Sequence, residues 1–86
     1  MDDDEDKPTL LSRILIEAEN KPLTSNDVKN IFGLEIHAAR MFLMRLWRYG
    51  KLNREKLNII SGGIYYRYTL TTGGRKKVEW LHSIGY

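Results

Sequence analysis

The sequence predicts an α+β fold in which four helices and one β-hairpin form a single domain. Apolar residues recur at helical spacing in three segments before residue 50, and again after residue 72. Between them, two strand-like runs flank the turn Ser61-Gly62-Gly63. A chain of 86 residues is too short for a second domain. Because a two-stranded hairpin is not stable alone, it must fold back over the helices.

The first helix is expected to begin near Pro8, which suits a first helical turn, and to end near Glu19. Its apolar stripe consists of Leu10, Leu11, Ile14, Leu15 and Ala18. Leu23 then fits a very short strand.

The second helix is predicted from its N-terminal signal, Thr24-Ser25-Asn26-Asp27, in which Asp27 follows Thr24 by three residues. Its apolar stripe is formed by Val28, Ile31 and Phe32. Gly33 ends it, because glycine tolerates the left-handed conformation of many helix C-termini. The turn that follows is so short that the next helix must cross steeply, as in a helix-turn-helix.

The third helix is expected from about Glu35 to Tyr49, with Gly50 ending it. Each residue advances the helix by about 100°, which sorts its side chains into two faces. The buried stripe contains Ala39, Phe42, Leu43, Leu46 and Gly50. The opposite face contains His37, Met41, Met44 and Arg48, flanked by Arg40 and Arg45. The only carboxylate, Glu35, is expected in the first turn, where the helix dipole favours it.

The alternative interpretation of this face is an ordinary solvated helix surface. Such surfaces usually mix positive and negative charges, whereas this one has no acidic residue. Arginine suits guanine or phosphate, and an exposed methionine suits the methyl group of thymine. The pattern therefore predicts a helix face that binds nucleic acid.

Charge supports an anionic partner. The net charge is +3, yet residues 2–6 are all acidic. From Lys7 onward, 14 basic residues face 6 acidic ones, a net charge of +8. Nucleic acid is the commonest partner of so basic a domain. We expect residues 1–7 to form a flexible acidic tail on a domain spanning 8–86; the alternative is that the tail competes with nucleic acid.

The hairpin is predicted from strands at 52–60 and 64–70. Strand alternation assigns Ile64, Tyr66, Tyr68 and Leu70 to the core face and Tyr65, Arg67 and Thr69 to the other. Arg54, Lys56 and Arg67 are expected to project towards phosphates or a minor groove. Alternatively, they only protect the hairpin edge against aggregation.

The last helix is expected from about Gly74 to Ser83, capped by Thr71-Thr72, with Val78, Leu81 and Ile84 on its buried side. The apolar residues of the first and last helices suit packing within one monomer and a homodimer equally well.

Several functions are disfavoured. The absence of cysteine excludes disulfides and iron–sulfur clusters. His37 and His82 are the only histidines and lie on different predicted helices, so we expect no metal site. No serine has a nucleophile context, and neither glycine pair matches a phosphate-binding loop. We therefore expect no enzyme and no cofactor.

The chain has no apolar run long enough to span a membrane, and no secretory signal is expected. Glutamine is absent, while lysine, arginine, isoleucine and tyrosine are frequent, which favours a thermophilic, intracellular (cytoplasmic) protein.

Three motifs resemble the winged helix-turn-helix family of DNA-binding proteins. The segment from Thr24-Ser25-Asn26-Asp27-Val28 to Gly33-Leu34 resembles the supporting helix and turn. Arg45-Leu46-Trp47-Arg48-Tyr49-Gly50-Lys51-Leu52 resembles the end of a recognition helix that leads into the wing. Tyr66-Arg67-Tyr68-Thr69-Leu70-Thr71-Thr72-Gly73-Gly74-Arg75 resembles the return strand of the wing and the Y-x-L-T-x-x-G-R entry to the last helix of MarR-like, ArsR-like and PadR-like regulators.

The resemblance covers about residues 9–84. It implies that Ile36, His37, Arg40, Met41 and Met44 read the major groove and that Arg54, Lys56 and Arg67 lie on the wing. Glu35 stands where the family often has serine or threonine. The function implied is a small sequence-specific protein that binds double-stranded DNA and regulates transcription. The alternative is a protein-interaction module of a larger assembly, favoured by the apolar segment Leu57-Asn58-Ile59-Ile60 and by Trp80.

Overall fold

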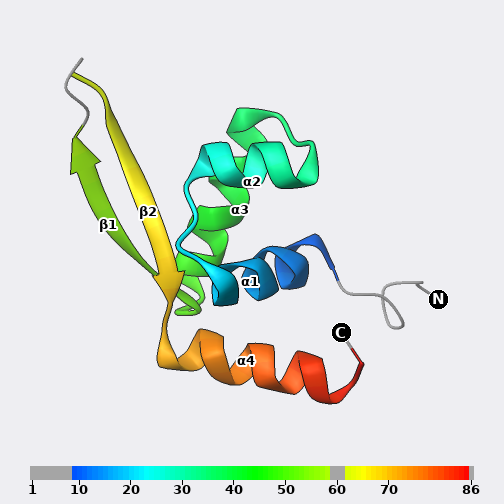
Figure 1. The fold of residues 1–86 in the computed structure, drawn as a ribbon. Helices are drawn as coiled ribbons and strands as arrows, with labels where there is room; N and C mark the ends of the chain where they lie inside the picture. Colours follow the sequence, from blue (N-terminus) through cyan, green and yellow to red (C-terminus); the bar gives the residue numbers. More distant parts are fainter. Residues whose placement is uncertain (1–8, 59–61, 86) are drawn as a thin grey trace.

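The computed structural model describes residues 9–58 and 62–85. In chain order, the elements are α1 (Leu10–Asn20), α2 (Ser25–Phe32), α3 (Ile36–Arg48), β1 (Leu52–Asn58), β2 (Ile64–Leu70) and α4 (Thr72–Ser83). The predicted α+β order of elements is confirmed. The helices gather at one end of the molecule, and the hairpin extends away from them (Figure 1). Pro8, the acidic run, Ile59, Ile60 and Ser61 lie outside the described residues.

Threonine side chains begin three of the described helices. Thr9 caps α1 by accepting from the Ser12 N–H, and Thr71 caps α4 by accepting from the Gly74 N–H. At α2, the Asp27 N–H donates to Thr24 Oγ1 at 3.2 Å, and the Thr24 N–H donates to Asp27 Oδ2 at 2.9 Å. This is the predicted reciprocal capping box. Such caps each contribute about 0.5–2 kcal/mol.

The turn between α2 and α3 depends on Gly33, which has φ 67°. Its N–H and that of Leu34 both donate to the Lys29 carbonyl and so close the end of α2. A side chain at this left-handed conformation would be strained by about 1–2 kcal/mol. The sharp turn gives the predicted helix-turn-helix, in which α2 packs against α3.

The hairpin is tied to the helices at its base. Its antiparallel register places Leu52 opposite Leu70 and Asn58 opposite Ile64. Leu23 forms a single β-bridge with Tyr68 through hydrogen bonds of 2.9 and 2.8 Å. This bridge is the very short strand expected at Leu23. The connection between α1 and α2 therefore holds β2 near the base of the hairpin.

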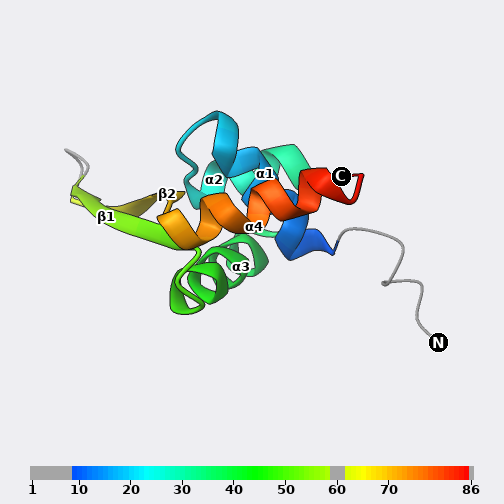
Figure 2. The ribbon, with the colours of Figure 1, turned by 90° about the horizontal axis from the view of Figure 1, so that it is seen from below.

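One apolar core lies between the helices and the base of the hairpin. It consists of Ile14, Leu15, Ala18, Leu23, Val28, Ala39, Leu43, Leu46, Leu52, Tyr68 and Val78, and Leu81 is also buried. Helix α1 packs against α4, α3 and β2. Seen from below, α4 crosses in front of α1, and α3 lies to one side of both (Figure 2). Within the described residues, no helix is long and apolar enough to cross a membrane.

Four residues that the sequence assigned to buried faces are exposed: Ile31, Gly50, Ile64 and Ile84. Gly50 leaves the helix axis with φ 77°, and Ile84 follows the last residue of α4. Ile64 lies at the distal end of the hairpin, and Ile31 borders the narrow stripe through which α2 packs. Helical or strand periodicity assigns a face but cannot show where the neighbouring element ends.

The two glycines at the start of α4 are not equivalent. A Cβ atom at Gly74 would collide with the backbone carbonyl of Lys51, whereas one at Gly73 would meet its nearest atom, the Gly50 carbonyl oxygen, at an ordinary 3.4 Å. We expect Gly74→Ala to destabilise the fold by more than 1 kcal/mol. Gly73→Ala should stabilise it by up to about 1 kcal/mol, because alanine favours a helix. Urea unfolding of both variants provides the measurement, and equal effects would contradict the close approach.

Candidate nucleic-acid interface

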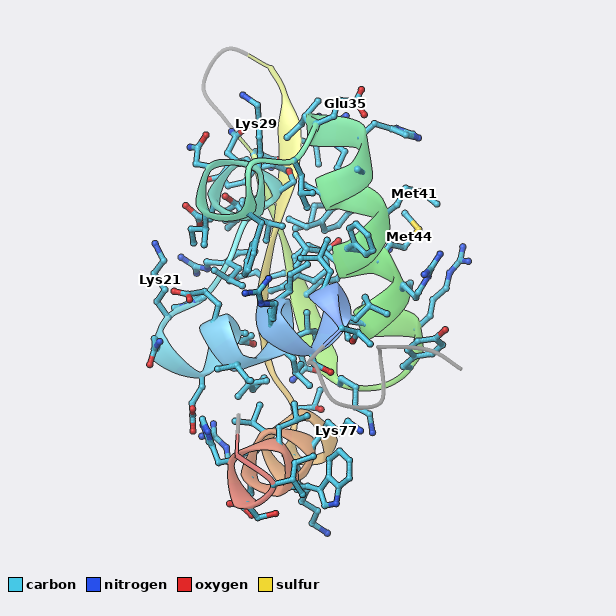
Figure 3. All side chains as sticks on the ribbon, turned by 90° about the vertical axis from the view of Figure 1, so that its right-hand side faces the viewer. Lys21, Lys29, Glu35, Met41, Met44 and Lys77 are labelled. Carbon is cyan, nitrogen blue, oxygen red and sulfur yellow. The ribbon has the colours of Figure 1, made fainter. Side chains whose placement is uncertain are left out.

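The outward face of α3 carries the residues that the sequence placed there. Ala39, Leu43 and Leu46 are buried, as predicted. The side chains on the other face are exposed at His37, Arg40, Met41, Arg45 and Arg48 and half-buried at Ile36 and Met44. Met41 and Met44 point away from the helices of the core (Figure 3). The rotation of α3 is therefore the predicted one.

A shallow hollow of about 210 Å³ lies on this face. Its lining residues are Met41, Met44, Arg45, Arg48 and Tyr49. No carboxylate belongs to this set, so the hollow combines positive charge with apolar, polarisable side chains. Such a surface complements base edges and phosphates.

Glu35 lies at the very start of α3, one position before the first turn in which it was expected (Figure 3). Its backbone is extended, with φ −72° and ψ 148°, and its side chain makes no capping hydrogen bond. Its carbonyl accepts from the Ala39 N–H at 3.0 Å. The carboxylate is therefore set at the edge of the α3 face.

The three cations of the hairpin, or wing (β1 and β2), are Arg54, Lys56 and Arg67, and they have different surroundings. Arg67 Nη2 donates to Glu55 Oε1 at 2.7 Å, because these two residues are directly opposite in the hairpin register. Both side chains are exposed. The pair is locally neutral, so Arg67 does not project as the free cation that the sequence suggested. Lys56, opposite Tyr66, is exposed and has no ion-pair partner among the described residues.

Arg54 is held against the helices. Its guanidinium carbon lies 3.7 Å from the centre of the Trp47 ring and 4.2 Å from that of Tyr66. Trp47 belongs to the last turn of α3, and Tyr66 belongs to β2. The stack therefore joins both strands of the hairpin to α3, and Arg54 is half-buried instead of projecting into solvent.

A second hollow, of about 180 Å³, separates α3 from the hairpin. Arg40 and Met44 line it from α3, Arg54 and Tyr66 from the wing, and Ser25 from the first turn of α2. Met44 also lines the hollow on the outer face of α3. The outer face of α3 and the inner side of the wing therefore form one continuous surface.

Sequence reasoning gave no role here to Trp47 and Glu55. The ion pair between Glu55 and Arg67 could have been predicted from the hairpin register, because side chains directly opposite each other on two antiparallel strands are neighbours. Trp47 gave no such signal, because its contact with Arg54 requires the wing to fold back on α3.

No group of three or more metal-ligating side chains occurs within residues 9–58 and 62–85. His37 lies on α3, whereas His82 Nε2 lies 3.0 Å from Glu19 Oε1 and links α4 to α1. The structure thus brings the two histidines to separate places.

The aromatic stack should contribute measurable stability. We expect a double-mutant cycle of Trp47→Ala and Arg54→Ala to give a coupling energy of about 0.5–2 kcal/mol, because a guanidinium between two rings is partly desolvated. The matched control is the pair Lys77 and Trp80, in which the ammonium lies 4.2 Å from the centre of a single ring that is more exposed than that of Trp47. Its coupling should be smaller. A coupling near zero for the first cycle, measured by urea unfolding, would contradict a structural role for the stack.

Comparison with known proteins gives the fold. No protein-family model matches the chain, and no curated protein matches its sequence. Solved structures do match. RV1404 from Mycobacterium tuberculosis superposes with a TM-score of 0.74 at 21% identity, over 94% of this chain and 54% of its own. MarR from E. coli, in its apo form, gives 0.74 at 23% identity, over 93% and 58%.

Bacillus subtilis PadR in complex with operator DNA gives a TM-score of 0.74 at 20% identity, over 84% of this chain and 46% of its own. The chain spans about half the length of these proteins. The likeness includes α3 and the hairpin within a match that covers most of the chain. The protein therefore has the winged helix-turn-helix fold of MarR and PadR, as its motifs predicted.

Proposed function

We propose that this protein is a small sequence-specific DNA-binding protein that regulates transcription. In this proposal, α3 enters the major groove of double-stranded DNA, and the wing contacts the backbone or the minor groove. The observation that carries it is the exposed face of α3, which has three arginines, a histidine and no acid, on a body of net charge +8 from Lys7 onward. Positive charge without nearby acid is what binding to a polyanion requires.

The contacts follow from side-chain chemistry. An arginine donates two parallel hydrogen bonds to guanine, and apolar side chains contact the thymine methyl group. The residues proposed for the major groove are Ile36, His37, Arg40, Met41, Met44, Arg45 and Arg48. Of the wing residues Arg54, Lys56 and Arg67, the first two are the better candidates, because Glu55 already neutralises Arg67.

The similar structures support this proposal through the fold. PadR was solved with operator DNA, and its match extends over 84% of this chain. The alternative of a protein-interaction module is not favoured by these comparisons. In the proposal, residues 8–86 form the DNA-binding domain and residues 1–7 an acidic tail.

A homodimer would present two recognition helices to a palindromic site. The surface of α4 supports one, because Trp80 is 51% exposed and Ile84 is 50% exposed beside α1. Val78 and Leu81 are already buried within the monomer.

Arg40 provides the test of specificity. Arg40→Ala should cost about 1–3 kcal/mol on the selected sequence and relax the preference at one base position. Lys76→Ala, on exposed α4, removes the same charge and should leave that preference unchanged. Selection of bound fragments from random duplex DNA gives the sequence, and mobility-shift titration gives the affinities. Absence of duplex binding by the wild-type protein at low salt would refute the proposed function.

The dimer is tested separately by light scattering. We expect the wild-type protein to have twice the monomer mass and Trp80→Glu to shift it towards the monomer, because the charge would be buried at an apolar contact. Ile31→Glu, at an exposed apolar site on α2, is the matched control and should leave the mass unchanged. A wild-type mass of about 10.1 kDa would refute the dimer.

A further inference from the structure

We infer that the hollow between α3 and the wing seats one phosphodiester group of the DNA backbone and that Arg54 is its principal ligand. The inference rests on the proposed function and names a contact that the function alone does not specify. It separates Arg54 from Arg67, two wing arginines that the sequence treats alike.

The Arg54 side chain is held against two aromatic rings. Its guanidinium carbon lies over the Trp47 ring, 3.7 Å from the ring centre, and over the Tyr66 ring, 4.2 Å from the ring centre. A guanidinium donates its hydrogen bonds in its own plane, so stacking leaves these donors available. Arg54 has neither a hydrogen bond nor an ion pair with any described residue. The two rings therefore hold this cation in place without using its hydrogen-bond donors.

Holding the Arg54 side chain in place before an anion binds has an energetic consequence. A free arginine loses considerable rotamer entropy when it binds an anion. The aromatic stack imposes much of this order before the anion arrives. A stacked arginine with unused donors is thus a preorganised anion ligand.

The lining of the hollow supplies further groups that can bind an anion. Arg40 adds a second guanidinium, and Ser25 and Tyr65 add hydroxyl groups that can donate to an oxyanion. Ser25 is the first residue of α2. No acid is present among the described residues that line this hollow.

The size and position of the hollow select the anion. At about 180 Å³, it is smaller than the roughly 300–1,000 Å³ of pockets that bury a small organic ligand. It adjoins the outer face of α3 through Met44. A helix in the major groove has a phosphate backbone along each side, and contacts to that backbone set the register of the protein. A backbone phosphate is the anion that reaches this position.

The test is the salt dependence of binding to a 20-bp duplex of random sequence. The logarithm of the binding constant should fall with the logarithm of salt concentration at a slope of about −4 to −7 for 4–8 phosphate contacts. We expect Arg54→Ala to make this slope shallower by about 0.9, which is the loss of one phosphate contact. Arg54→Lys should keep the slope but weaken binding, because lysine retains the charge and lacks the planar fork.

A control removes charge elsewhere. Lys76→Ala on α4 should leave the slope at its wild-type value. A wild-type slope for Arg54→Ala, or the same change in slope for Lys76→Ala, would overturn the inference and leave the proposed function standing. Failure of the wild-type protein to bind the duplex would remove both.

A second measurement uses the unmodified protein, which avoids any unfolding of the Arg54→Ala variant. The side-chain Nε–H resonance of Arg54, observed by ¹H–¹⁵N NMR, should shift when the same duplex is added, and that of Arg67 should shift less. An unmoved Arg54 resonance in the bound complex would overturn the inference.

Discussion

The orientation of α3 depends on the burial of Ala39, Leu43 and Leu46, which fixes the rotation of the helix about its own axis. Burial of a large aliphatic side chain is worth about 1.5–3 kcal/mol, far more than an exposed charge contributes. The core therefore decides which side faces solvent, and the arginines occupy the side that remains. The left-handed Gly33 allows α2 to reach α3 immediately and complete this contact.

The wing is positioned by contacts at two levels. Near its base, Leu23 pairs with Tyr68, and the Thr71 hydroxyl donates to the Gly50 carbonyl at 2.6 Å. Farther out, the Trp47–Arg54–Tyr66 stack joins both strands to the end of α3. A two-stranded hairpin has too little buried surface to hold its own orientation. These contacts make the wing an extension of the helical domain.

Whether a surface cation can bind an anion depends on its ion-pair partners as well as on the number of charged residues. Arg67 and Arg54 lie on opposite faces of the hairpin, and only the first meets a carboxylate. On α3, Glu35 lies at the helix start, and the arginines farther along have no ion-pair partner among the described residues. The anion binding that we propose therefore depends on particular arginines, which the net charge of the chain does not identify.

The sequence alone determined the order of the elements, the capping box at Thr24, the end of α2 at Gly33 and the outward side of α3. These features depend on local periodicity and on the conformational preferences of single residues. Hairpin register also made the pair of Glu55 and Arg67 accessible. Only the tertiary structure decided that Arg54 lies between Trp47 and Tyr66 and that Ile64 and Ile84 are exposed. Those outcomes depend on how far one element extends over another, a distance that no local pattern encodes.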